Sequence, residues 1–131
     1  MNTVWARLVG EAADARQRAY APYSGFAVGA ALLAADGSVF TGANVENASY
    51  GLTLCAERVA LAGAVAAGKR EFAALAVVAE GSTVPCGACL QSLAEFAPSL
   101  PVILAEPGGP PRALELAHLL PKPFTSREKL P

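Results

Sequence analysis

The chain has 131 residues, with 10 Lys and Arg against 11 Asp and Glu and a formal net charge of -1. This length is typical of one domain, so we expect residues 1–131 to form a single domain. A near-neutral chain has no basic surface with which to collect nucleic acid, and its longest apolar run, residues 59–68, is too short to span a bilayer. A small-molecule substrate is therefore expected, with neither nucleic acid nor membrane as a partner.

Hydrophobic residues make up 53% of the chain, which is high for a protein without membrane spans. The excess predicts apolar surface that is buried between subunits of a homo-oligomer. Residues 1–16 lack the basic segment followed by an apolar one that marks a secretion signal, so we expect a cytoplasmic protein. In that compartment the three cysteines favour metal binding or catalysis over disulfides.

The first half of the chain predicts one helix and a strand hairpin. Apolar residues recur at helical spacing over residues 5–19, and the helix must end before Pro22. Strands are expected over residues 26–34 and 38–42, because the Asp-Gly pair between them favours a tight turn. Residues 44–50 are polar and predict a loop.

The second half alternates helices with apolar strands. Helices are expected over residues 54–68 and 86–97, and strands over residues 72–79 and 101–105. Beyond residue 112 the pattern places only a short helix and a turn. A hairpin followed by alternating helices and strands predicts an α/β fold, in which a mixed sheet lies between helices.

Three cysteines in two short motifs predict a catalytic zinc site. Cys86 and Cys89 lie three residues apart at the start of an expected helix, where they share one face and can hold one ion, and Cys55 would add a third thiolate from the start of another helix. Helix starts favour thiolates through their unpaired N–H groups and positive dipole ends. Catalytic zinc keeps three protein ligands and one open position, and no fourth cysteine exists to close the site.

Glu57 follows Cys55 by two residues and is the candidate catalytic carboxylate. Residues two apart in a helix point in nearly opposite directions, so Cys55 must lie at the helix entrance if both face one site. Arg58 is a candidate to offset the net charge of about -1 that three thiolates and Zn²⁺ carry together. The alternatives are an ordinary acidic residue of a first helical turn for Glu57 and a solvated helix residue for Arg58.

Other sites fit the same cysteines. Cys86 and Cys89 could form a redox dithiol, or His118 could close a structural zinc site as the fourth ligand. His118 lies in a leucine-rich tail without ligand-like spacing. A closed site would make the protein a non-catalytic zinc module.

Five ordered motifs span most of the chain: PYSGFAVGAA at residues 22–31, NVENASY at 44–50, CAER at 55–58, PCGACLQ at 85–91 and LPKPF at 120–124. In type and spacing they resemble the small homotetrameric cytidine deaminases. The resemblance implies a three-layer α/β/α fold with a central mixed sheet of about five strands, and Zn²⁺ as cofactor. It also implies hydrolysis of cytidine and 2'-deoxycytidine to uridine and 2'-deoxyuridine with release of ammonia, a step of pyrimidine salvage.

The resemblance also assigns substrate-binding residues. Asn44 and Glu46 would bind a ribose hydroxyl, and Phe26 and Phe124 would pack on the pyrimidine, in keeping with the polar groups of amides and carboxylates and the flat faces of aromatic rings. Taken singly, loop polarity would explain the first two and core packing the last two. Ala48 and Tyr50 would belong to a site that is shared between subunits. Ala56 is the remaining substrate-binding residue.

On this interpretation Glu57 takes a proton from the attacking water, which adds to carbon 4 of the base, and then delivers protons to ring nitrogen 3 and to the leaving amine. One departure is Leu90, where the family usually has Arg, so more of the charge must be offset by Arg58 and the helix ends. A deaminase of a cytosine-nucleoside antibiotic, of the blasticidin S deaminase kind, is an alternative with the same metal motif.

Overall fold

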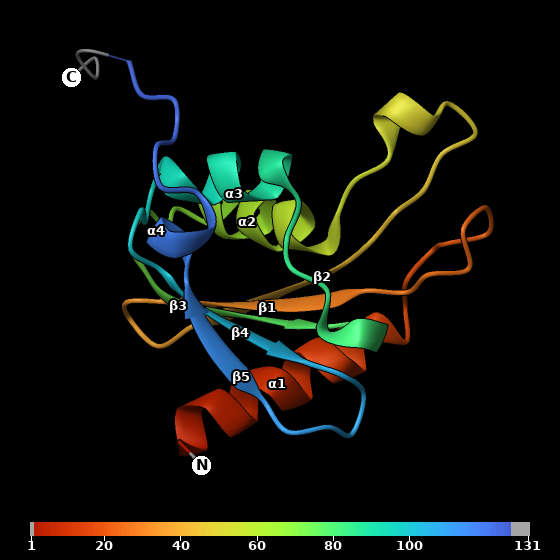
Figure 1. Ribbon diagram of the computed structural model, residues 1–131, viewed down its shortest axis with the longest axis horizontal. Helices are drawn as coiled ribbons and strands as arrows, with labels where there is room; N and C mark the ends of the chain where they lie inside the picture. Colours follow the sequence, from red (N-terminus) through yellow and green to blue (C-terminus); the bar gives the residue numbers. More distant parts are fainter. Residues whose placement is uncertain (1, 127–131) are drawn as a thin grey trace.

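Five strands form one mixed sheet in the computed structural model, which describes residues 2–126 (Figure 1). In the order β2-β1-β3-β4-β5, β3 and β4 run parallel and the other neighbouring pairs run antiparallel. The predicted α/β class with a mixed sheet is confirmed. The strands are β1 (Gly29–Ala34), β2 (Val39–Ala43), β3 (Phe72–Val78), β4 (Pro101–Ala105) and β5 (Arg112–Glu115).

Helices cover both faces of the sheet and make the three layers that the resemblance implied. The helix α1 (Thr3–Arg16) lies on one face, and α2 (Ala56–Ala66), α3 (Gly87–Ala94) and the short α4 (Leu116–Leu119) lie on the other (Figure 1). Short 3-10 turns precede α2 and α3 in the chain, namely η1 (Tyr50–Leu52) and η2 (Glu80–Ser82). No helix in residues 2–126 is long and apolar enough to cross a membrane.

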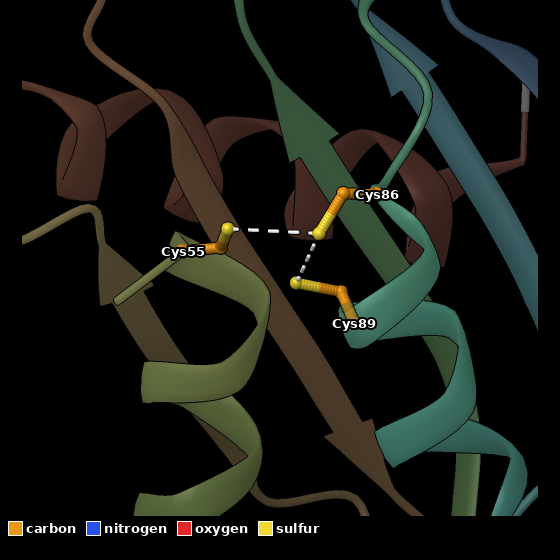
Figure 2. Close-up of side chains that lie close together, drawn as sticks. All are labelled: Cys55, Cys86 and Cys89. Carbon is orange, nitrogen blue, oxygen red and sulfur yellow. Dashed lines mark hydrogen bonds between the residues drawn. The ribbon is translucent and has the colours of Figure 1, made fainter. Parts of the chain in front are cut away.

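Each face of the sheet has its own apolar core, because successive side chains of a strand point to opposite faces. Ile103 packs with Leu8 and Ala12 beneath α1, whereas its neighbour Leu104 packs with Leu75 in the core that α2 and α3 cover. Burial of apolar side chains is the main favourable term in folding, at about 25 cal/mol per Å². The second core holds α2 and α3 beside each other, and the residues that begin the two helices lie close together (Figure 2).

The structure differs from the predictions at the first helix, at the start of β1 and at β5, and α2 and α3 are shorter than the expected ranges 54–68 and 86–97. The first helix ends at Arg16 rather than at residue 19. The strand β1 begins at Gly29, because side chains supply most of the hydrogen bonds of residues 26–28 and only the carbonyl of Val28 accepts from the backbone N–H of Asn44. The strand β5 was not predicted from its residues. Of its four residues only Leu114 is partly buried and the other three are exposed, so its sequence carries no clear apolar alternation. The strand is held by its pairing with β4.

Candidate metal centre and active site

The three cysteines meet where two helices begin (Figure 2). Cys55 is the N-cap residue of α2 and Cys86 that of α3, both with extended backbone, and Cys89 lies in the first turn of α3. All three sulfur atoms lie within 4.8 Å of one another, with 3.8 Å between Cys55 and Cys86 and 3.6 Å between Cys86 and Cys89. Cys55 thus occupies the helix entrance, the position that lets it share a site with Glu57.

The donor set fits zinc. Thiolates bound at about 2.3 Å to a tetrahedral zinc lie about 3.8 Å apart, which agrees with the observed sulfur distances of 3.6 and 3.8 Å. Within residues 2–126 the group of ligand-type side chains contains these three cysteines and no fourth member, and His118 is exposed on α4. Three protein ligands are the arrangement of a catalytic rather than a closed structural zinc site.

Arg58 lies beside the cysteine group. Its Nη2 donates to Sγ of Cys55 over 3.7 Å, while its Nε is buried without a hydrogen-bond partner in the described part of the chain. Hydrogen bonds from Cys89, Arg58 and Cys86 lower the pKa of the Cys55 thiol to about 5, although its partial burial opposes the shift. The bond with Cys55 and burial together raise the pKa of Cys89. Leu90, whose aliphatic side chain carries no charge, is 5% exposed and belongs to the core beneath α2 and α3.

Glu57 is a buried carboxyl group next to the cysteines. It lies in the first turn of α2, is 5% exposed, and lines a pocket of about 270 Å³ together with Cys55 and Cys86. Burial raises the pKa of this carboxyl, and the charge on Cys55 adds to the rise, while its own backbone N–H and Arg58 lower it. A carboxyl group with a raised pKa can both accept and donate a proton nearer to neutral pH.

The walls of this pocket come from five parts of the chain. They are the segment before β1, the loop after β2, the start of α2, the strand β3 and the segment before α3. The predicted substrate-binding residues in its lining are Phe26, Asn44, Glu46 and Ala56. Residues that sequence analysis did not select also line it, namely Ser24, Val28, Thr53, Leu54, Val77, Thr83 and Val84.

The amide of Asn44 binds the backbone of the pocket wall. Its Nδ2 donates to the carbonyl oxygen of Phe26 over 2.8 Å, and its Oδ1 accepts from the N–H of Val28 over 2.9 Å. Asn44 is 8% exposed, so these bonds satisfy a largely buried polar group. A primary amide has a second N–H and a second lone pair, which are free to meet a ligand.

The carboxylate of Glu46 also holds the wall. It accepts from the hydroxyl of Ser24 and from the backbone N–H groups of Tyr23 and Ser24, at 2.9 and 3.1 Å for the latter two. The bond from the Ser24 hydroxyl, followed by the backbone bonds, lowers the pKa of Glu46 against the effect of desolvation. Glu46 is therefore ionised and fixed at the pocket.

Three of the predicted substrate-binding residues lie outside the pocket. Ala48 is exposed on the loop after β2, and Tyr50 is 74% exposed and makes an edge contact with Tyr23 at 5.8 Å between ring centroids. Phe124 is 80% exposed, but the side chain of Gln91 accepts from its N–H over 2.9 Å and donates to its carbonyl oxygen over 2.8 Å. The segment that carries Phe124 is thus tied to α3, with the aromatic ring left uncovered.

The family comparison decides between the possible uses of this site. A family model described as the cytidine and deoxycytidylate deaminase zinc-binding region matches residues 4–105. The chain belongs to the cytidine and deoxycytidylate deaminase family. It is therefore an enzyme with a zinc-binding centre, and neither a redox dithiol protein nor a non-catalytic zinc module is needed to explain the cysteines.

Relatives in this deaminase family match nearly the whole chain. A cytidine deaminase of Sporosarcina psychrophila is 50% identical, covering 93% of this chain and 92% of that protein, and one of Halalkalibacterium halodurans is 51% identical, covering 92% and 94%. The crystal structure of cytidine deaminase from Burkholderia pseudomallei is 53% identical, with a TM-score of 0.87 over 91% of this chain and 98% of that one. That of the Mycobacterium tuberculosis enzyme is 44% identical with a TM-score of 0.81, over 93% and 98% of the two chains.

The residues of the site and its surroundings that sequence analysis missed had different signals. Thr83 and Val84 directly precede the PCGACLQ motif, so their proximity to Cys86 was a usable signal. Gln91 lies inside the motif, but nothing in the sequence indicates that it binds the backbone of Phe124, 33 residues further along the chain. Such pairings depend on the fold and not on local pattern.

Proposed function

We propose that the protein hydrolyses cytidine and 2'-deoxycytidine to uridine and 2'-deoxyuridine with release of ammonia, as a cytoplasmic enzyme of pyrimidine salvage. The observation that carries the proposal is the buried Glu57 beside three converging cysteines, two of which line the same pocket as Glu57. The pocket volume of about 270 Å³ is near the lower end for small-molecule sites, which suits a nucleoside. The curated cytidine deaminases at 50% and 51% identity support this substrate class.

Cys55, Cys86 and Cys89 would hold the zinc ion, which when bound supplies a Lewis acid that makes water a nucleophile near neutral pH. Glu57 accepts a proton from the water that attacks carbon 4 of the base. The same carboxyl group then donates this proton to ring nitrogen 3. It takes the second proton from the oxygen that is now bonded to carbon 4 and donates it to the amine, which leaves as ammonia when the C–N bond breaks. Its burial, which raises its pKa, suits both roles, and Arg58 offsets negative charge beside Cys55.

Other lining residues of the pocket would bind the nucleoside. Phe26 packs against the pyrimidine, and Ala56 lies at the start of α2 between Cys55 and Glu57. Asn44 and Glu46 bind a ribose hydroxyl with the polar capacity that remains after their bonds to the backbone. Both are held rigidly, which reduces the entropy lost on binding.

We further propose that the enzyme is a homotetramer in which neighbouring subunits complete each other's sites through Ala48, Tyr50 and Phe124. Large apolar side chains are exposed between β2 and α2, before α3 and on the segment that carries Phe124, and exposed apolar surface of this kind marks interaction sites. The exposure of the Phe124 ring does not result from an unattached chain segment, because Gln91 binds both the N–H and the carbonyl oxygen of Phe124. The exposed set includes Tyr50 (74%), Leu52 (65%), Leu54 (44%), Val84 (42%) and Phe124 (80%).

Ammonia release tests the proposed reaction. Zinc content and product formation should be measured on one sample with cytidine, 2'-deoxycytidine and the cytosine-nucleoside antibiotic blasticidin S. We expect one zinc per chain and turnover of both nucleosides far above that of the antibiotic. Faster turnover of the antibiotic would replace the proposal by the antibiotic deaminase, and zinc without turnover of any of the three would contradict it.

A further inference from the structure

The strand β1 loses its neighbour on one edge as it approaches the pocket. Its antiparallel pairing with β3 ends at Gly29 and Val78. Continuing that register would place Ala27 opposite Glu80, but the chain turns away there into η2. The carbonyl group of Ala27 therefore lies on an open edge, although the residues on either side of it line the pocket.

Arg16 occupies the place of the missing strand. Its Nε donates to the carbonyl oxygen of Ala27 over 2.9 Å, and its Nη2 lies 3.8 Å from Oε1 of Glu80. The side chain of Arg16 is 25% exposed. A planar guanidinium with several fixed donors can meet a carbonyl and a carboxylate at once, which a single ammonium group does less well.

The position of Arg16 is itself fixed by close packing of α1 on β1. Arg16 is the last residue of α1, and the chain crosses it at Gly29. A β-carbon at Gly29 would come within 1.9 Å of the carbonyl oxygen of Ala12 and 2.8 Å of Cβ of Arg16. Only glycine allows this approach. The guanidinium therefore leaves a helix end that lies in direct contact with the strand.

Asn44 supplies hydrogen bonds to the opposite edge of residues 26–28. It binds the carbonyl of Phe26 and the N–H of Val28, while Arg16 binds the carbonyl of Ala27 between them. Phe26 and Val28 face the pocket and Ala27 does not. Arg16 thus contacts no part of the pocket lining directly, yet it fixes one edge of the segment that carries two lining residues.

The ion pair with Glu80 extends this link to a second wall. Glu80 begins η2, and the hydroxyl of Thr83 donates to its carbonyl oxygen over 3.1 Å. Thr83 and Val84 line the pocket. Arg16 therefore links the wall at residues 26–28 to the wall at residues 83–84. The link consists of its hydrogen bond to Ala27, its ion pair with Glu80 and the hydrogen bond between Glu80 and Thr83.

We propose that Arg16 is a positioning residue for nucleoside binding: it replaces a strand behind residues 26–28 and holds two pocket walls at their working separation. The identity of the ligand rests on the proposed function, but the placement of the walls does not. Because a mispositioned wall weakens contacts made equally by bound substrate and transition state, the loss should appear mainly in KM.

Arg16→Met tests this, since it keeps an aliphatic stem and removes every donor. Arg18→Met is the matched control. Arg18 lies just beyond the same helix and is exposed, and within residues 2–126 its side chain pairs only with Asp14 on that helix. We expect Arg16→Met to raise KM for cytidine five- to tenfold, about the effect of one lost hydrogen bond, with kcat and zinc content within twofold of the original. Arg16→Lys should lie between, and Arg18→Met should change neither constant.

Amide hydrogen exchange over residues 24–29 gives a second measurement that does not depend on activity. Exchange should be faster in Arg16→Met and unchanged in Arg18→Met. An unchanged KM overturns the proposal, and so does a lower melting temperature with normal KM, which would make Arg16 a stabilising residue only. If Arg16→Met does not fold, Arg16→Lys and Glu80→Ala decide by the same two measurements. Faster exchange in a protein that does not deaminate cytidine would contradict the proposed function while leaving the wall-holding role intact.

Discussion

The cysteine group and the exposed aromatic residues differ in how completely one chain builds them. The cysteines and Glu57 converge from the starts of two helices that share a core, and Glu57 is only 5% exposed. Tyr50 and Phe124, assigned to the substrate by resemblance, are 74% and 80% exposed and lie outside the pocket. Bond-making groups need fixed geometry, which a core supplies, whereas apolar contacts to a flat base can come from a second copy. The two regions should therefore fail in different ways.

The largest effect should come from the cysteine group. Cys55→Ala, Cys86→Ala and Cys89→Ala should each lose zinc and all activity, because two thiolates cannot retain the ion. Metal analysis of the purified variants measures this. His118→Ala is the control and should keep one zinc per chain, since His118 is exposed on α4 and lies outside the group. Loss of zinc on changing His118 would restore the closed structural site.

The exposed region should fail without losing zinc. Phe124→Ala should lower kcat/KM about tenfold, the size expected for a lost aromatic contact, with zinc content unchanged. Mixing it with Glu57→Gln after unfolding and joint refolding should restore activity, because sites with Glu57 from one chain and Phe124 from another then form. Sedimentation should give the mass of four chains. An active monomer, or no gain over the separate variants, would place the whole site in one chain.

Arg58 sharpens the comparison on the side of the cysteine group. Arg58→Gln removes the hydrogen bond of 3.7 Å to Cys55 and the charge beside it. Residues that support metal ligands typically contribute about 10- to 100-fold to metal affinity, so zinc should pass to a competing chelator about tenfold more readily. Arg18→Gln, which removes an exposed charge elsewhere, should have no effect. Equal zinc retention in both variants would show that Arg58 is a packing residue and that the helix ends suffice.

The smallest effect should come from Gln91, which acts on the exposed region only through Phe124. Gln91→Ala removes two hydrogen bonds to the backbone of Phe124 and should lower kcat/KM a few-fold. In a Phe124→Ala background the same change should add nothing, as a double-mutant cycle would show. Ser92→Ala is the control, because its hydroxyl bonds to Ala88 within α3. Additive losses would assign Gln91 a separate role.

Local pattern predicted most of the fold. Residues 101–105 form the expected strand, and helices lie within the ranges expected over residues 54–68 and 86–97, although each is shorter. These elements bury one face or both, so their apolar spacing is strong. The strand β5 has no such signal, because its residues are mostly exposed and its pairing with β4 depends on a chain that has already folded.

The site, like the fold, has parts that the local sequence predicted and parts that it did not. The spacing of Cys86 and Cys89 is local and predicted a shared ligand group, and the entrance position of Cys55 followed from Glu57. The bonds of Asn44 and Glu46 to the pocket wall were not predictable, because they join residues 16 to 23 positions apart. Sequence indicates which side chains can do chemistry, and the fold decides which of them also hold the wall.

Turnover by Glu57→Gln tests the central claim most directly, because the change removes the proton-transferring group and keeps a side chain of the same shape at a buried position. Purified with zinc equal to the original protein and a similar melting temperature, the variant should form uridine from cytidine about 10²- to 10⁴-fold more slowly. Near-normal turnover at equal zinc content would contradict the account and show that Glu57 is structural.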